Sequence, residues 1–186
     1  MATTLASQPV TIREYLKFKS PEGFRDELIY GKIVVSPEPK ILHFQIADNL
    51  YKLLGKTVGK KFRVAQRVNL TLPAINSMPS PDVFVIERDE YNSAMQSGSY
   101  PDGRRVPLVV EVLSPGNRKK AVQLKLGIYR RHGIEAWVVD PKHREIKIYR
   151  GREESTLSAD ADEMLPLPTA LGTKTLPLSK IFDLLA

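Results

Sequence analysis

The sequence predicts an α/β or α+β fold with a mixed central sheet flanked by helices. One observation is the order of strand, helix and strand over residues 108–139, which indicates a βαβ-like crossover. The other is that residues 108–113 are almost wholly apolar, as in a strand covered on both faces. The 186 residues suit one domain, so we expect a single domain over 1–186 with 1–10 as a loose leader.

The first elements are predicted from a cap and a turn. Residues 11–18 resemble a short helix that begins at Thr11 and stops before a Ser-Pro pair. Residues 24–28 and 32–35 flank Tyr30-Gly31, a turn signal, and are expected to form a hairpin.

The middle of the chain is predicted from hydrophobic spacing. Residues 41–54 place apolar side chains at a helical period, and Gly55 marks the expected end of that helix. Residues 62–72 and 83–86 have strand character. Residues 92–105 are polar and contain glycine and proline, which indicates a mobile loop.

A helix and two strands are expected after the apolar strand at 108–113. The helix spans about 118–132 and is closed by Gly133. The strands, 134–139 and 145–149, flank an Asp-Pro turn.

Composition excludes several classes of protein. Hydrophobic residues make up 42% and charged residues 26%, and no apolar run approaches the roughly 20 residues that span a bilayer, so no membrane association is expected. The first residues lack the basic region and apolar core of a secretion signal, and a cytoplasmic location is expected. The absence of cysteine excludes a thiolate nucleophile and a cysteine zinc site.

The positive charge is concentrated in one segment. The net charge is +7, and residues 117–152 carry eleven Lys or Arg against three acids, whereas 153–186 carry six acids against two lysines. Such a segment suits a polyanion such as the DNA backbone, and the alternative is an ordinary solvated face.

Glu111 is the residue that calls for a chemical explanation. It lies within the apolar strand at 108–113, where an ionised carboxylate is costly unless it is paired or binds a metal. On a helical wheel from residue 118, the apolar side chains, Leu124 among them, cover an arc from roughly 240° through zero to roughly 80°. Lys125 falls at roughly 340°, in the middle of that arc. Lys125 is therefore a candidate neighbour of Glu111.

Asp82 supplies a second carboxylate at the start of another predicted strand. Two convergent carboxylates suit Mg²⁺ or Mn²⁺, which keep waters and bridge to phosphate oxygens. A buried Lys125 would orient or deprotonate the attacking water and stabilise charge on the phosphate. Asp82, Glu111 and Lys125 together indicate metal-assisted phosphodiester hydrolysis.

At these residues the sequence resembles the Uma-type endonucleases, members of the PD-(D/E)XK restriction-endonuclease-like superfamily. The motifs that carry the resemblance are Arg25-Asp-Glu-Leu28, His43, Pro81-Asp82, Pro107-Leu-Val-Val-Glu-Val-Leu-Ser-Pro115, Lys125 with Tyr129, and Gly133-Ile-Glu-Ala-Trp-Val-Val-Asp-Pro141. The resemblance covers roughly residues 10 to 185. It implies a restriction-endonuclease-like core of four mixed strands flanked by helices, and Asp82 and Glu111 as metal ligands.

Two departures from the motif stand out. The superfamily motif would have a lysine at position 113, which is Leu113 here, and the family pattern moves that lysine to the helix, where Lys125 matches it. The family also commonly has an aspartate one turn before the lysine, at the position of Ala121. If that aspartate assists the metal or the lysine, this copy is slow or inactive.

Several side chains have two readings. Glu27 is either a further site carboxylate or a solvent-facing strand residue, and His43 either lines the site or belongs to the helix start or core. Gln66 lies on a predicted strand, and the sequence does not determine whether its side chain points inward. Tyr129 is read as packing. Glu111 with Lys125 could be a purely structural ion pair, and Asp82 a turn acid.

Three functions are compared. The first is an Mg²⁺- or Mn²⁺-dependent DNA endonuclease with Asp82, Glu111, Lys125 and Glu27 in its site, and the resemblance favours a homodimer because cutting both strands takes two sites. The second is a catalytically inactive nucleic-acid-binding or assembly module of the same fold. The third is a dimeric domain whose basic face binds a protein.

Overall fold

The computed structural model describes residues 3–4, 8–114 and 119–184. The helices are α1 (Ile12–Tyr15), α2 (Ile41–Thr57), α3 (Arg88–Ser97), α4 (Lys119–Arg131) and α5 (Leu178–Ile181). The strands are β1 (Thr3–Thr4), β2 (Phe24–Ile29), β3 (Lys32–Pro37), β4 (Phe62–Gln66), β5 (Val83–Glu87), β6 (Leu108–Val112), β7 (Glu135–Asp140), β8 (Glu145–Arg150), β9 (Glu153–Ser158), β10 (Met164–Pro166) and β11 (Thr175–Pro177).

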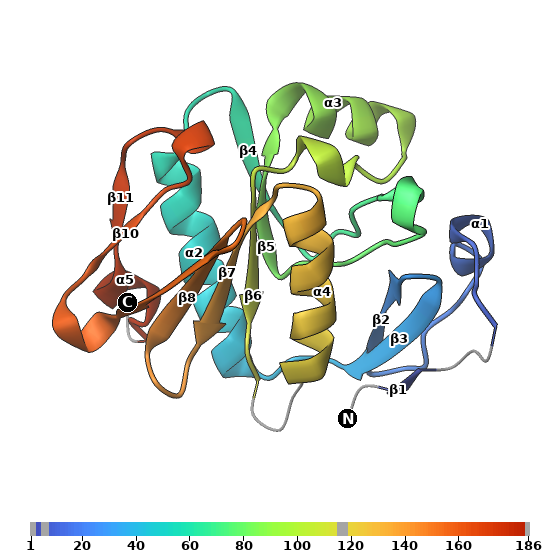
Figure 1. Cartoon of the computed structure of the whole chain (residues 1–186), viewed down its shortest axis with the longest axis horizontal. Helices are drawn as coiled ribbons and strands as arrows, with labels where there is room; N and C mark the ends of the chain where they lie inside the picture. The colour runs from blue at the N-terminus through green and yellow to red at the C-terminus, as the bar shows by residue number, and fades with distance from the viewer. Residues whose placement is uncertain (1–2, 5–7, 115–118, 185–186) are drawn as a thin grey trace.

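A six-stranded mixed sheet forms the centre of the fold, in the order β4-β5-β6-β7-β8-β9. Strands β6 and β7 are parallel, with Val110 opposite Trp137, and every other neighbouring pair in this sheet is antiparallel. Helix α4 makes the crossover between the parallel strands (Figure 1). The predicted fold class is confirmed, although the sheet has six strands where the resemblance implied four.

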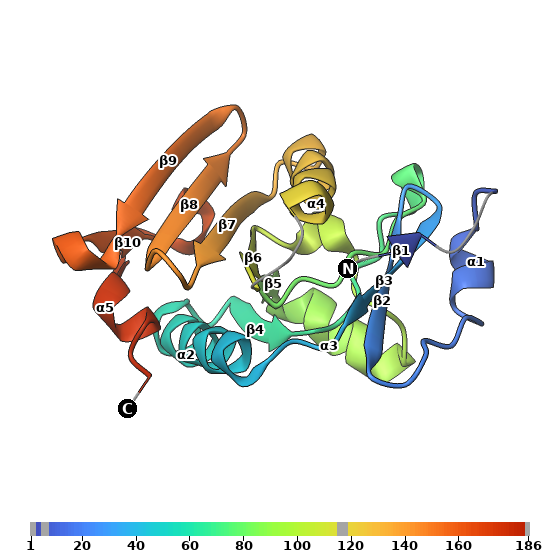
Figure 2. The same cartoon turned by 90° about the horizontal axis from the view of Figure 1, so that it is seen from below.

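Helices α2 and α4 cover opposite faces of this sheet (Figure 2). On the α2 side, Leu50 packs in one core with Val85 and Val110. On the α4 side, Leu126 packs in a second core with Val109. Because both faces are buried, consecutive residues of β6 are all apolar except Glu111.

A smaller antiparallel sheet, ordered β1-β3-β2, lies beside α4 (Figure 1). The hairpin is confirmed, with Leu28 opposite Ile33, and β1 places Thr3 and Thr4, from the expected leader, against β3. A bridge between Leu28 and Met78 joins β2 to the segment before β5. This bridge brings β2 close to the start of β5.

Two local expectations were wrong. Residues 92–105 were predicted as a loop, but helix α3 continues through residue 97, with Asp89 and Glu90 in its first turn and Gly98 capping it in the left-handed region. The strand expected over 62–72 ends at Gln66, because Arg67 has a positive φ.

Two helix details also differ. Helix α2 continues through Gly55 to Thr57. Leu124, placed on the inward arc of α4, is 51% exposed because it lies at the limit of that arc. Within the described residues, no helix is long and apolar enough to cross a membrane.

Candidate active site

The predicted site carboxylates meet at one end of the central sheet. Because β5 and β6 are antiparallel, the start of β5 and the end of β6 lie side by side, and the Asp82 amide donates to the Val110 carbonyl at 3.1 Å. Helix α4 brings Lys125 over this end of the sheet, and β2 brings Glu27. Four side chains from four different elements or their ends are thereby assembled.

Asp82 is held by three donors and is almost fully buried. Its Oδ1 accepts from Arg25 Nη1 at 2.9 Å, and its Oδ2 lies 3.0 Å from His43 Nε2 and 2.8 Å from the Val112 amide. Burial alone would raise the pKa of Asp82, but the bond from His43 and the charge of Arg25 outweigh it, so the pKa lies well below its usual value. Asp82 is ionised at neutral pH.

Glu111 is paired with two side chains of α4. Lys125 Nζ donates to its Oε2 at 2.6 Å, and the Tyr129 hydroxyl donates to its Oε1 at 2.7 Å. Burial, only partly offset by Lys125, raises the pKa of Glu111 to about 7, and the charges of Asp82 and Glu27 act in the same direction. Glu111 therefore gains and loses its proton near neutral pH.

Lys125 is an ammonium ion between two carboxylates. Its Nζ also donates to Glu27 Oε1 at 3.0 Å, and that oxygen accepts from the Ser80 amide at 2.7 Å. Burial lowers the pKa of Lys125, but Glu111 and Glu27 outweigh it and the pKa lies above its ordinary value. A lysine that stays protonated acts as a donor and a positive charge rather than as a base.

The cluster carries more negative than positive charge when its carboxyls are ionised and His43 is neutral. Three carboxylates, Asp82, Glu111 and Glu27, face the two permanent cations Arg25 and Lys125. Such an excess in a buried place favours the entry of a cation.

A small cavity lies among these groups and is a candidate metal position. It measures about 20 Å³, room for one water-sized particle, and its lining includes Asp82, Glu111, Glu27 and Lys125. Within residues 3–4, 8–114 and 119–184, one hydrogen bond is recorded to Asp82 Oδ1 and one to each Glu111 oxygen, and a carboxylate oxygen has a second lone pair. Among the described residues, no group of three or more His, Asp or Glu is placed so that it could hold a metal ion.

The structure gives positions for the residues whose roles the sequence did not decide. Glu27 is buried in the cluster, and His43 contacts Asp82. Tyr129, read as packing, also hydrogen-bonds to Glu111, a role that its place one turn after Lys125 could have indicated. Arg25 opens one of the motifs that carry the family resemblance, but it was not named as a site residue. Gln66 pairs with Val83 in the sheet and is not among the residues that line the small cavity.

The position of Ala121 bears on activity. Ala121 and Leu113, the two departures from the motif, both line the small cavity. A carboxylate at position 121 would therefore face the site, as the family pattern implies.

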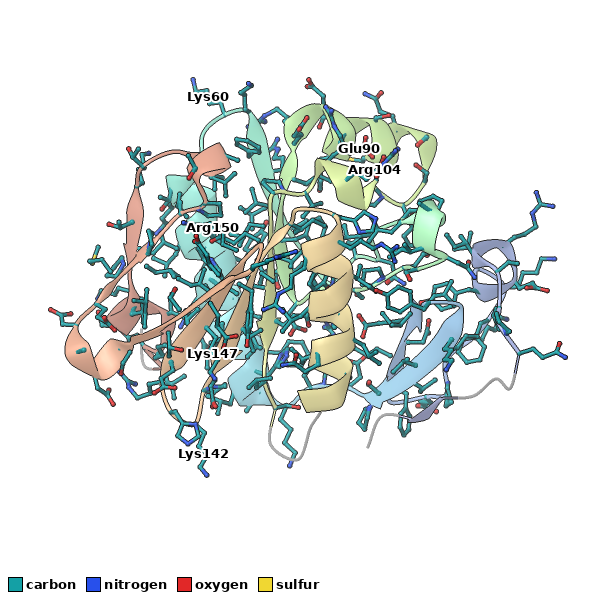
Figure 3. All side chains as sticks on the ribbon, viewed as in Figure 1. Lys60, Glu90, Arg104, Lys142, Lys147 and Arg150 are labelled. Atoms are coloured by element: carbon teal, nitrogen blue, oxygen red, sulfur yellow. The ribbon has the colours of Figure 1, made fainter. Side chains whose placement is uncertain are left out.

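The basic segment 117–152 is partly neutralised. Asn117 and Arg118 lie outside the described residues. In the remainder, Arg144 pairs with Asp160 and Arg150 with Glu135. Figure 3 shows Lys142 and Lys147 on the side of α4 away from β2 and β3.

Comparisons with known proteins agree with this fold. Residues 12–179 match the model of the Uma2 family, whose description is "Putative restriction endonuclease". A crystal structure from Anabaena variabilis ATCC 29413, described as a putative nuclease belonging to DUF820, superimposes with a TM-score of 0.78. It is 22% identical, and the match covers 94% of this chain and 98% of that one, which shows a shared fold. A search of curated proteins gave no match.

Proposed function

The chain belongs to the Uma2 family of restriction-endonuclease-like proteins, and from this premise we propose that it is a metal-dependent endonuclease that hydrolyses DNA phosphodiester bonds. The observation that carries the proposal is the position of Lys125 Nζ, which bonds to Glu111 and Glu27 and lines a cavity shared with Asp82. A lysine and carboxylates around a space for one small ion suit hydrolysis of a phosphodiester.

Asp82 and Glu111 would hold Mg²⁺ or Mn²⁺ through the lone pairs that their present hydrogen bonds leave free. When bound, the ion supplies neutralisation of the phosphate charge and activation of water. Asp82 is ready for this role because its low pKa keeps it ionised, whereas Glu111 must first release its proton.

Lys125 would stabilise the negative charge that develops on the phosphate. Its ammonium group donates to Glu111 and Glu27, and among the described residues its third N–H donor has no recorded partner, so it could donate to a phosphate oxygen or the attacking water. Glu27 and Tyr129 hold Lys125 and Glu111 in position, so we assign them positioning roles.

Plasmid nicking with Mg²⁺, Mn²⁺ or EDTA tests the proposal. We expect metal-dependent nicking by the wild type, none by Asp82→Ala, and none by Lys125→Met. Lys180→Met, which removes an exposed lysine of α5 outside the basic segment 117–152, is the matched control and should nick as the wild type does. Nicking that persists in EDTA or in Asp82→Ala would refute the proposal.

A second candidate function is a nucleic-acid-binding module without turnover. Ala121 favours it, because this side chain lines the cavity where the family pattern has a carboxylate. DNA binding with steep salt dependence, and no nicking with either metal, would select this second function.

A further inference from the structure

A second, larger cavity lies next to the carboxylate cluster and has no role in the chemistry described so far. It measures about 470 Å³, within the roughly 300–1,000 Å³ of small-molecule sites. Its walls come from α1 and the residues that follow it, from β2, from the segment after β4 and from the loop after α3. These elements lie on the α1 side of the molecule in Figure 1. We call this cavity the Arg25 groove.

Arg25 connects the two cavities. Its side chain lines both, and its Nη1 bonds to Asp82. A guanidinium carries five N–H donors, and in the described part of the chain the other four have no hydrogen-bond partner. Arginine presents these donors as a planar fork that matches a phosphate group. A phosphate at the boundary of the two cavities would therefore lie beside both Arg25 and Asp82.

The rest of the groove suits a nucleoside. Tyr100 is 46% exposed there, and Phe18 contributes a second ring from a different segment. Asn69 donates to the Tyr15 hydroxyl, and no described residue bonds to its amide oxygen, which is left as an acceptor. Aromatic faces with a few hydrogen-bonding groups are the features that bind an unpaired base.

The net charge of the groove argues against a surface that simply follows a polyanion. Arg25 and Arg67 are balanced by Asp26 and Glu38, and Arg67 is ion-paired with Glu38. A groove of about 470 Å³ has room for one nucleotide, and a base that stacks on Tyr100 would have to leave the stack of a duplex. Binding there would rest on one phosphate and one base.

We propose that the Arg25 groove binds a single unpaired nucleotide of a nucleic-acid strand, with its phosphate at Arg25 and its base on Tyr100. This proposal rests on the proposed function in one respect: it assumes that the strand bound in the Arg25 groove is the substrate of the neighbouring carboxylate cluster. The substrate class is then single-stranded or locally unpaired nucleic acid.

Calorimetric titration in EDTA tests the groove without any cleavage. The probes are thymidine 5′-monophosphate, thymidine, inorganic phosphate, a single-stranded oligonucleotide and its duplex. We expect the monophosphate to bind more tightly than thymidine or phosphate, and the single strand more tightly than the duplex.

Two tyrosine variants locate the binding. Tyr100→Ala should weaken single-strand binding roughly 5- to 150-fold, the range for the stacking of one base on an aromatic ring. Tyr51→Ala is the matched control, because Tyr51 is 38% exposed and lies on α2 outside the groove. Arg25→Lys keeps the positive charge but loses the planar set of guanidinium donors. It should weaken the binding of thymidine 5′-monophosphate and leave the affinity for thymidine unchanged.

The outcomes separate this inference from the proposed function. Binding that depends on Tyr100 in a protein that never nicks DNA would support the groove and refute the nuclease. Equal affinity for duplex and single strand, or equal effects of the two tyrosine variants, would overturn the groove even if nicking is observed.

Discussion

Replacing Glu111 by glutamine should change how stability depends on pH. In the native state the pKa of Glu111 is raised to about 7 by burial, against 4.5 for the ordinary side chain. Between these two values the folded protein keeps a proton that the unfolded chain has lost. The free energy of unfolding therefore falls as pH rises through this window, and the change is complete above about pH 7.

The size of the effect follows from the pKa values. At about 1.36 kcal/mol per pH unit, the shift from 4.5 to about 7 corresponds to about 3 kcal/mol of unfolding free energy. Glutamine cannot titrate, so Glu111→Gln should gain about 3 kcal/mol relative to the wild type between about pH 4.5 and about pH 7.5.

Urea unfolding in EDTA across this pH range measures the difference directly. Glu153→Gln, which removes an exposed carboxylate of β9, is the control, and its free energy of unfolding should equal that of the wild type at every pH. A constant difference between Glu111→Gln and the wild type would refute the reasoning, because it would show that folding does not shift the pKa of Glu111.

Four further predictions concern the same molecule. Tyr129→Phe removes the hydroxyl that bonds to Glu111 and should lower the free energy of unfolding by about 1.5–3 kcal/mol in urea titrations; a loss below about 0.5 kcal/mol would mean that the bond contributes nothing. Mg²⁺ affinity, measured by calorimetry, should rise up to about tenfold per pH unit below about pH 7, because the metal displaces the Glu111 proton; a pH-independent affinity would remove Glu111 from the metal site. Ala121→Asp should increase the initial rate of plasmid nicking by about tenfold or more, and an unchanged rate would show that the alanine is no defect. Lys142→Gln with Lys147→Gln should reduce the slope of log affinity for duplex DNA against log salt by about 1.8, and an unaltered slope would place the DNA elsewhere than on residues 117–152.

The parts of the site that could be predicted from sequence are those with a strong local signal. Lys125 interrupts the apolar face of a helix, and Glu111 interrupts an apolar strand, so each conflicts with its own surroundings. The structure joins the two at 2.6 Å. A conflict of this kind is visible without any knowledge of distant contacts.

The parts that could not be predicted depend on contacts between distant segments. Arg25 has no unusual neighbours in sequence, and its role appears only when β2 lies beside the start of β5. In the sequence, Tyr129 is equally consistent with the apolar face of a helix and with a site, because its ring can pack in a core while its hydroxyl donates a hydrogen bond to Glu111. Helix α3 was missed because Ala94 is its one buried residue, which leaves no apolar stripe to detect.

The cluster is assembled from segments that are far apart along the chain, and this has a consequence for biosynthesis. Lys125 bonds to Glu27, which precedes it by 98 residues, and Asp82 bonds to His43 across 39. During translation Glu27, His43 and Asp82 are added to the chain before Glu111 and Lys125. Contacts of such long range form only as the whole fold closes. A nascent chain therefore has no complete site, and any hydrolysis begins only after synthesis has passed α4 and the chain has folded.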